Sequence, residues 1–237
     1  MDEEQKRVNE IAARSRYAEG LNTQTTRYSF AIFKRYLRPG SILELGPAEG
    51  VMTECLYSKS HDLSAVEGSA LFCEGLRERF PRLKVINALF EEFETERTYD
   101  NIILGHVLEH VKDPALILSK VREWLAPAGR VFAAVPNAHS LHRQAAVIMG
   151  LLKHEKELSD NDLYHGHRRV YDPESFRADF IAAGLKIEHF GGYWIKPLSN
   201  RQIEESWTEQ MVDAFMLLGE RYPEIAAEMV VVASCMQ

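Results

Sequence analysis

Cysteine is scarce in this chain. Only Cys55, Cys73 and Cys235 occur among the 237 residues, and no two of them form a C-x-x-C pair. Three scattered cysteines cannot supply a disulfide framework, and they lack the spacing of a thiolate zinc site. The sequence therefore predicts a protein of a reducing compartment, and we expect it in the cytoplasm.

Excess basic charge and long apolar runs are lacking as well. Aspartate and glutamate number 35 against 28 lysines and arginines, which gives a formal net charge of -7. This balance argues against a broad nucleic-acid footprint, because such a surface needs a basic face. No run approaches the roughly 18 apolar residues of a membrane span, and the amino-terminal MDEEQKRVNE has no apolar signal core. We expect neither nucleic acid nor a membrane as a partner.

Apolar residues are plentiful, at 46% of the chain, which is enough for one sizeable core. Their spacing predicts helices at 3–20, 25–37, 51–59, 70–80 and 114–125, and strands at 41–46, 63–68, 85–90, 101–111 and 129–137. The fourth of these strands passes into a loop. Buried strands that alternate with helices of about ten residues are typical of a doubly wound, mostly parallel α/β sheet with helices on both faces.

The second half of the chain changes character. Residues 138–171 are rich in His and Arg and poor in strand signal, so we expect an insertion over the carboxyl edge of the sheet. A helix is predicted at 172–185, with Asp172 as N-cap and Pro173 in the first turn. Closing strands are predicted at 186–195 and 228–235, with one helix over 200–222 between them. The apolar stripe of that helix (Trp207, Met211, Phe215 and Leu218) predicts either a core face or a homodimer contact.

The stretch SILELGPAEG places bare backbone at Gly46 and Gly50, where the first strand turns into a helix. Ligands of such sheets bind beyond the carboxyl ends of the strands. The turn is neither a G-x-G-x-x-G fingerprint nor a Walker A loop, and Ala48 and Glu49 disfavour a nicotinamide dehydrogenase. Glu67 lies at the next strand end, 21 positions after Gly46, about the spacing at which a carboxylate reaches ribose hydroxyls. These features indicate a nucleoside ligand without phosphates.

Five segments in this order, LELGPAEG, VEGS, INALFEEF, YDNIILGHVLEHVKDP and LAPAGRVFAAVPN, resemble the class I S-adenosylmethionine-dependent methyltransferases over about residues 25–136. The resemblance implies a seven-stranded Rossmann-like sheet with its last strand antiparallel, and S-adenosylmethionine as cofactor. It implies a single methyltransferase domain over 1–237. We divide that domain into a helical cap (1–38), a cofactor-binding core (39–137), a substrate-side insertion (138–171) and closing helices and strands (172–237).

The same resemblance assigns cofactor-binding residues. Its first motif, around the methionine moiety, covers Glu44, Gly46, Pro47 and Gly50, and its ribose acid is Glu67, followed by Gly68. Leu89 and Phe90 match positions beside adenine, and His106 matches the residue at the end of the fourth strand near the methionine. Many relatives carry Asp where this chain has Ala88, so we expect adenine recognition here to use backbone groups and apolar packing.

The histidines raise the question of a metal. His106 and His110 are four residues apart, but the zincin pattern needs Glu directly after the first His, and here Glu109 directly precedes the second. We therefore expect no metal, with His110 as a structural residue.

The insertion supplies the predicted acceptor site. Candidate substrate-binding residues are His142, Arg143, Tyr164, His165, Arg168, Arg169 and Tyr171. Guanidinium groups bind carboxylate or phosphate in bidentate fashion, so this basic cluster suits an anionic or hydroxyl-rich small molecule. For the general base the candidates are His139 or His167, and then His106. The segments PNAHS and GHRRVY resemble methyltransferases that tailor glycans and natural products.

The expected reaction is methyl transfer to a hydroxyl or acidic oxygen of an anionic or sugar-like metabolite. An alternative is N-methylation of a small amine, which needs no base once the amine has lost its proton. A third reading is a cofactor-binding regulator or partner that has lost catalysis.

Overall fold

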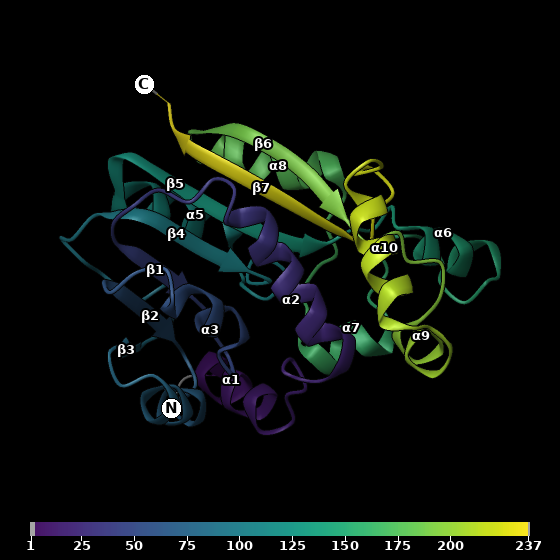
Figure 1. Ribbon diagram of the computed structural model, residues 1–237, viewed down its shortest axis with the longest axis horizontal. Coiled ribbons are helices and arrows are strands. Elements are labelled where there is room, and N and C mark those ends of the chain that lie inside the picture. The colour runs from purple at the N-terminus through teal and green to yellow at the C-terminus, as the bar shows by residue number, and fades with distance from the viewer. Residues whose placement is uncertain (1–2, 237) are drawn as a thin grey trace.

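The computed structural model describes residues 3–236 and contains one seven-stranded sheet in the order β3-β2-β1-β4-β5-β7-β6 (Figure 1). The strands are β1 (Ile42–Leu45), β2 (Leu63–Glu67), β3 (Lys84–Asn87), β4 (Tyr99–Gly105), β5 (Leu125–Pro136), β6 (Leu185–Tyr193) and β7 (Glu228–Cys235). Strands β1 to β5 pair in parallel, and β7 runs antiparallel to both β5 and β6. The predicted sheet, including its antiparallel last strand, is confirmed.

Helices cover both faces of the sheet. One face packs against α5 (Pro114–Trp124) and α8 (Pro173–Ala182). The other face packs against α2 (Gly20–Phe33), α3 (Val51–Tyr57), α4 (Ala70–Arg79), α9 (Asn200–Ser206) and α10 (Glu209–Gly219). Neighbouring residues of a central strand serve opposite layers: Ile102 and Leu104 belong to the first core and Ile103 to the second. A strand buried on both faces is apolar throughout for this reason.

The helix boundaries differ from the prediction most in two regions, the first two helices and residues 200–222, and α2, α3 and α8 also end two to four residues earlier than predicted. Helix α1 (Glu3–Ala13) ends before residue 20, and α2 begins at Gly20 rather than at residue 25. The single helix predicted over 200–222 is wrong, because the chain breaks between α9 and α10. Thr208 caps α10 by accepting a hydrogen bond from the Met211 N–H at 3.3 Å, which starts a new helix there.

The apolar stripe of the last helices mostly faces the core. Trp207 and Phe215 pack together, with ring centroids 4.6 Å apart, against the second core, whereas Met211 is exposed. A homodimer stays a prediction. Among residues 3–236, no helix has the length and apolar content that crossing a membrane requires.

The insertion lies at the edge of the sheet to which β4 and β6 point, with α6 (Leu141–Ile148), α7 (Asp160–His165) and α9 gathered there (Figure 1). Strand β7 runs the opposite way, so its first residue, Glu228, reaches the same edge and pairs with Pro136 and Tyr193. Residues that follow six strands and the residue that starts the seventh therefore meet at one edge.

Candidate active site

A cavity of about 1430 Å³ opens along this edge. Its cofactor end is lined by residues at the ends of β1, β2 and β3, namely Glu44, Gly46, Pro47, Glu67, Gly68, Ala88, Leu89 and Phe90. Its acceptor end is lined by residues that follow β4 and β6, by the start of β7 and by the insertion. This volume is large enough for a nucleoside cofactor together with a small acceptor molecule.

The turn after β1 brings bare backbone to the cavity. Gly46 (φ +66°) and Ala48 (φ +47°) adopt left-handed conformations. A Cβ on Gly46 would lie 3.0 Å from Val107 Cγ2 and 3.3 Å from Phe90 Cζ, so a side chain here would crowd the cavity wall. Gly50 has another role: it starts α3 in a left-handed conformation and packs against α4, where a Cβ would lie 2.8 Å from Leu76 Cδ2.

Two buried carboxylates face this end. Glu44 accepts a hydrogen bond from the Thr53 hydroxyl at 2.7 Å, and burial raises the pKa of Glu44 to about 8. Glu67 accepts hydrogen bonds from the backbone N–H groups of Ser69 (2.8 Å) and Ala48 (3.2 Å). Burial raises the pKa of Glu67 to about 7 even though these bonds favour its ionised form. A carboxylate oxygen has two lone pairs, so Glu67 can also accept from ligand hydroxyls.

The cavity wall that follows β3 combines apolar side chains with backbone that the Asn87 side chain holds in place. The Asn87 side chain donates to the carbonyls of Glu67 (2.8 Å) and Gly68 (3.0 Å), which fixes the two strand ends together. Leu89 is buried beside Gly68, where a Cβ would lie 3.3 Å from Leu89 Cδ2. Bare backbone, a ribose-type acid and an apolar wall fit the adenosyl group of S-adenosylmethionine, whereas two carboxylates would repel phosphates.

His106 stands between the two ends of the cavity. It follows β4 with φ +59°, an uncommon conformation for a residue with a side chain. Its Nδ1 lies 3.3 Å from Glu109 Oε1, and its Nε2 lies 3.4 Å from the Tyr193 hydroxyl. Burial lowers the pKa of His106, but Glu109 and Glu228 raise it, and the net shift is upward. A carboxylate beside Nδ1 favours the tautomer with its proton there, so Nε2 keeps a lone pair.

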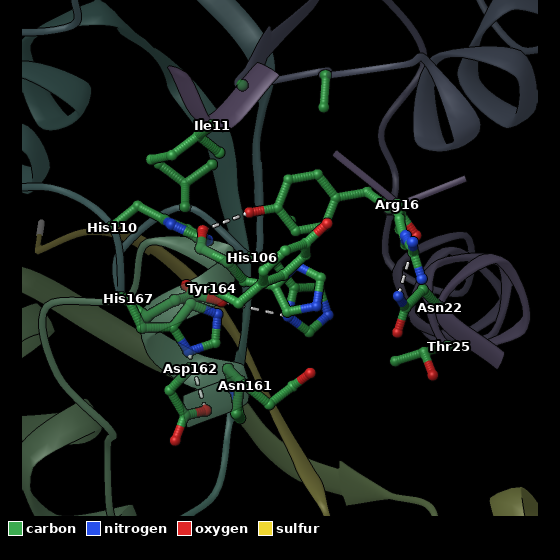
Figure 2. A pocket seen from close by; sticks show the side chains of 18 of the residues that line it. Ile11, Arg16, Asn22, Thr25, His106, His110, Asn161, Asp162, Tyr164 and His167 are labelled. Atoms are coloured by element: carbon green, nitrogen blue, oxygen red, sulfur yellow. Dashed lines mark hydrogen bonds and ion pairs between the residues drawn. The ribbon is translucent and has the colours of Figure 1, made fainter. Parts of the chain in front are cut away.

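Several predicted residues of the insertion do line the acceptor end. His142, Tyr164, His165 and His167 are among them. Figure 2 shows His110 and His167 on one side of the view, His106 in the middle, and Arg16, Asn22 and Thr25 on the other side. Burial lowers the pKa of His142 to about 3, so this imidazole is neutral at pH 7.

Five predicted residues are not brought to the large cavity: Gly50, His139, Arg168, Arg169 and Tyr171 are absent from its lining in the described part of the chain. His139 lies outside it, 3.6 Å from Glu155, and its candidacy as base is corrected. The Tyr171 hydroxyl is buried and donates to Asp179 at 2.8 Å.

The arginines of the insertion are structural rather than free for an anion. Arg169 donates to the carbonyls of Leu108 and Val111, and Arg168 donates to Glu4 and to the His110 carbonyl. Arg143 lines the cavity, but its guanidinium pairs with Asp162 at 3.0 Å and donates to the Glu155 carbonyl. Unpaired carbonyls of a loop attract buried guanidinium groups, and sequence spacing does not reveal them.

Three residues that sequence reasoning missed carry charge at the acceptor end: Glu109, Lys196 and Glu228. Burial lowers the pKa of Lys196 to about 8 and raises the pKa of Glu228. The signal for Glu228 was its place directly before the apolar run MVVVAS, because an antiparallel last strand starts at the ligand edge. The signal for Lys196 was its place just after β6.

The amino-terminal segment, residues 3–19, covers the cavity. Gln5 donates to the Gly68 carbonyl at 2.8 Å, which holds α1 over the cofactor end. The Tyr17 hydroxyl donates to the His165 carbonyl at 2.7 Å, and the two rings lie 5.1 Å apart. The Tyr164 hydroxyl donates to the Arg14 carbonyl at 2.7 Å. Residues 3–19 and α7 thus close the cavity from opposite sides.

Comparison with known proteins shows the family of the chain. A family described as a methyltransferase domain matches residues 15–190. A ubiquinone biosynthesis O-methyltransferase of Aeromonas salmonicida (strain A449) is 30% identical over 166 residues, covering 68% of each chain. An (S)-coclaurine N-methyltransferase of Thalictrum flavum subsp. glaucum is 31% identical over 99 residues, 39% of this chain and 27% of that one. The chain thus spans about a quarter of the latter relative's length.

The fold has solved counterparts. An S-adenosylmethionine-dependent methyltransferase of Thermotoga maritima superimposes with a TM-score of 0.63 at 15% identity, covering 98% of this chain and 95% of that one. At this identity the likeness concerns the fold alone. The family match, however, spans most of the chain and includes the glycine turn, Glu67 and His106. The chain therefore belongs to the class I S-adenosylmethionine-dependent methyltransferases.

Proposed function

We propose that the chain transfers the methyl group of S-adenosylmethionine to a hydroxyl oxygen of a polar small molecule bound at the acceptor end. The observation that carries the proposal is His106, which stands between the two ends of the cavity with its Nδ1 beside Glu109. A hydroxyl is a weak nucleophile and benefits from a base, and imidazole is the side chain whose ordinary pKa lies closest to neutral pH. The similarity to an O-methyltransferase supports the same choice.

The cofactor, when bound, supplies a methyl group that its positive sulfur makes electrophilic. Glu67 and the backbone at Gly46 and Gly68 would hold it, and Leu89 would pack beside its base. His106 accepts the acceptor's hydroxyl proton at Nε2 as the oxygen attacks, while Glu109 stabilises the resulting imidazolium. Residues 3–19 and α7 exclude water, and most of the rate comes from positioning and this exclusion.

The chemical class of the acceptor is inferred from the polar side chains at the acceptor end that are not paired within the protein. With Arg143, Arg168 and Arg169 paired to the protein, Lys196 is a cation that lines the acceptor end, close enough to Glu228 and His142 to interact with both electrostatically. Mixed charges and imidazoles bind hydroxyl and carbonyl groups by hydrogen bonds better than they bind a polyanion. A hydroxyl-rich or singly charged metabolite fits this end.

The test is product analysis. The purified chain is incubated with methyl-labelled S-adenosylmethionine and a panel of sugars, phenols, hydroxy acids and amines, and products are identified by mass spectrometry and NMR. We expect an O-methyl product, and His106→Gln lowers kcat by about 10²–10⁴-fold with unchanged affinity for S-adenosylhomocysteine. An N-methyl product, or a His106→Gln enzyme as fast as the wild type, contradicts the proposal.

A second candidate is N-methylation, favoured by one observation. Glu109 and Glu228 place two carboxylates at the acceptor end, where they would attract an ammonium group. The similarity to an N-methyltransferase is in line with this candidate. An amine panel that yields the only product, with turnover retained in His106→Gln, favours it. A chain that binds S-adenosylhomocysteine but turns over no acceptor is instead the catalytically idle partner.

A further inference from the structure

A buried carboxylate and two imidazoles converge on the wall of the acceptor end. Glu109 and His110 come from the loop after β4, and His167 comes from the segment after α7. One ligand atom from each lies within 4.8 Å of the other two. Figure 2 shows His110 and His167 near each other, with their ring centroids 4.8 Å apart. All three residues line the cavity.

Glu109 has no hydrogen-bond partner that would explain its burial. It is 1% exposed, and both of its carboxylate oxygens lack a hydrogen bond. Its closest titratable neighbour is His106, whose Nδ1 lies 3.3 Å from Glu109 Oε1. An ionised carboxylate that is buried without hydrogen bonds is costly unless a cation approaches it. Among the described residues only the imidazoles of His106, His110 and His167 favour the ionised form of Glu109, so this carboxylate suits a cation bound beside them.

His167 is oriented as metal-binding histidines are. Its imidazole is nine-tenths buried, and its Nδ1 lies 3.3 Å from Asp162 Oδ1 (Figure 2). A carboxylate behind one ring nitrogen fixes the tautomer and leaves the other nitrogen for a metal, an arrangement found behind most metal-binding histidines. Nε2 of His167 is then the ligand atom.

The loop that carries Glu109 and His110 is held rigid. The backbone N–H of Arg168 donates to the Glu109 carbonyl at 2.8 Å, and Arg169 donates to the carbonyls on either side, of Leu108 (2.7 Å) and Val111 (2.6 Å). These bonds also tie the loop to the segment that carries His167. The three groups thus keep their positions before any ligand arrives, as a metal site requires.

We propose that Glu109, His110 and His167 bind a divalent transition metal of the zinc class, with an open coordination position toward the acceptor end of the cavity. Two imidazoles and one carboxylate are the protein ligands of several catalytic zinc sites, which keep the fourth position for water or substrate. Bonds from such ligands to zinc are about 2.0–2.2 Å long, so the three ligand atoms, which lie within 4.8 Å of one another, would close around the ion on binding. On the proposed function, an oxygen of the acceptor takes the open position.

The cluster of Glu109, His110 and His167 does not have the zincin arrangement, so the missing zincin pattern in the sequence does not exclude a metal here. That pattern requires both histidines on one helix, whereas here residues 107–110 form a turn and the third ligand comes from a distant segment. His106, the first histidine of the pattern, is turned toward Tyr193 and Glu228 rather than toward His167. The proposed ligand set therefore omits it.

The test measures metal binding without turnover. The untagged full chain is dialysed against a chelator and titrated with Zn²⁺ by calorimetry, and with Co²⁺ by visible absorption. The wild type should bind one equivalent of each metal. Glu109→Gln, His110→Gln and His167→Gln should each weaken binding by at least about tenfold. His165→Gln, in the same segment but outside the cluster, should bind as the wild type does.

Two further measurements make the outcome decisive. Circular dichroism and the affinity for S-adenosylhomocysteine test whether each variant is folded. If one variant is not folded, the conclusion is drawn from the other two. The proposal is overturned if the wild type takes up no metal, or if all folded variants bind it as the wild type does. An N-methyl product with intact metal binding contradicts the proposed function alone, and O-methylation by a chain that binds no metal contradicts the metal site alone.

Discussion

Glu44 is the buried carboxylate that faces the cofactor end with only one neutral hydrogen-bond donor, Thr53. Burial raises its pKa from about 4.5 to about 8, so the folded chain holds a proton there that the unfolded chain releases above pH 4.5. The stability from this proton is complete below pH 4.5 and is lost as pH rises toward 8. Glu44 therefore lowers the stability of the ligand-free chain toward pH 8, but it supplies a carboxylate that can ionise beside a cationic ligand.

Glu44→Gln should stabilise the ligand-free protein more at pH 8 than at pH 5. Glutamine keeps an oxygen for Thr53 but has no charge to desolvate, and we expect a gain of roughly 2 kcal/mol at pH 8. Urea unfolding at the two pH values measures the difference. The control is Glu54→Gln, an exposed residue of α3, which should change stability by less than about 0.5 kcal/mol. An equal effect of Glu44→Gln at both pH values contradicts the prediction.

Arg169 stabilises the loop after β4 through its side-chain hydrogen bonds. Its guanidinium donates to three carbonyls, of Leu108, Val111 and Lys112, at 2.6–2.9 Å. Arg169→Lys should lower the free energy of unfolding by about 1–3 kcal/mol, because an ammonium group cannot present the planar fork. The exposed Arg201→Lys serves as the matched control. Unchanged stability together with a raised KM for the acceptor would restore Arg169 to the substrate site.

At the scale of single elements, α8 depends on its cap. Asp172 Oδ1 accepts the Ser175 N–H at 2.7 Å, and its other oxygen pairs with Lys156. Burial alone would raise the pKa of Asp172. The hydrogen bonds from Lys156 and Ser175 lower it by more, so the resulting pKa is about 2. The stability from this ionised cap is present above pH 3.8, the ordinary value, and is lost as pH falls through about 2.

Asp172→Ala should therefore destabilise the protein by about 1–2 kcal/mol at pH 7, and the difference from the wild type should shrink below pH 3. Thermal unfolding followed by circular dichroism from pH 7 downward measures both effects. Ser159→Ala, at the cap of the short α7, is the comparison, since that cap is held by Asp162 as well. A difference that stays constant down to pH 2 contradicts the assigned ionisation.

The sequence predicted the elements whose signals are local. Buried strands show as apolar runs, and Asp172 and Pro173 mark the start of α8, so these elements are where the pattern puts them. The break at Thr208 was missed because apolar spacing continues across it. Among site residues, Gly46, Glu67 and His106 follow strands in sequence and could be found. The pairing of Arg143 and Arg169 could not, since their partners, backbone carbonyls and for Arg143 also the Asp162 carboxylate, are brought near only by folding.

At the scale of the whole molecule, the cavity is closed by two segments far apart in sequence. Residues 3–19 and α7 meet through Tyr17 and Tyr164, and Gln5 anchors α1 to β2. Segments held by few hydrogen bonds open more easily than the core.

S-adenosylhomocysteine should slow hydrogen exchange in residues 3–17 and in α7, and leave α8 unchanged. The reason is that a ligand beneath these segments stabilises the closed form by mass action. Deletion of residues 1–19 should weaken the ligand's affinity about tenfold or more. Exchange that slows only in the core strands, with unaltered affinity after the deletion, contradicts the assigned role of these residues.

The central claim is that the adenosyl cofactor lies on the carboxyl edge of the sheet with its ribose at Glu67 and its sulfur toward His106. A crystal structure of the chain with S-adenosylhomocysteine tests it most directly. The account predicts both ribose hydroxyls within hydrogen-bond distance of Glu67, the base beside Leu89, and the sulfur opening toward the acceptor end of the cavity. A nucleoside bound elsewhere, or bound with its ribose away from Glu67, would contradict it.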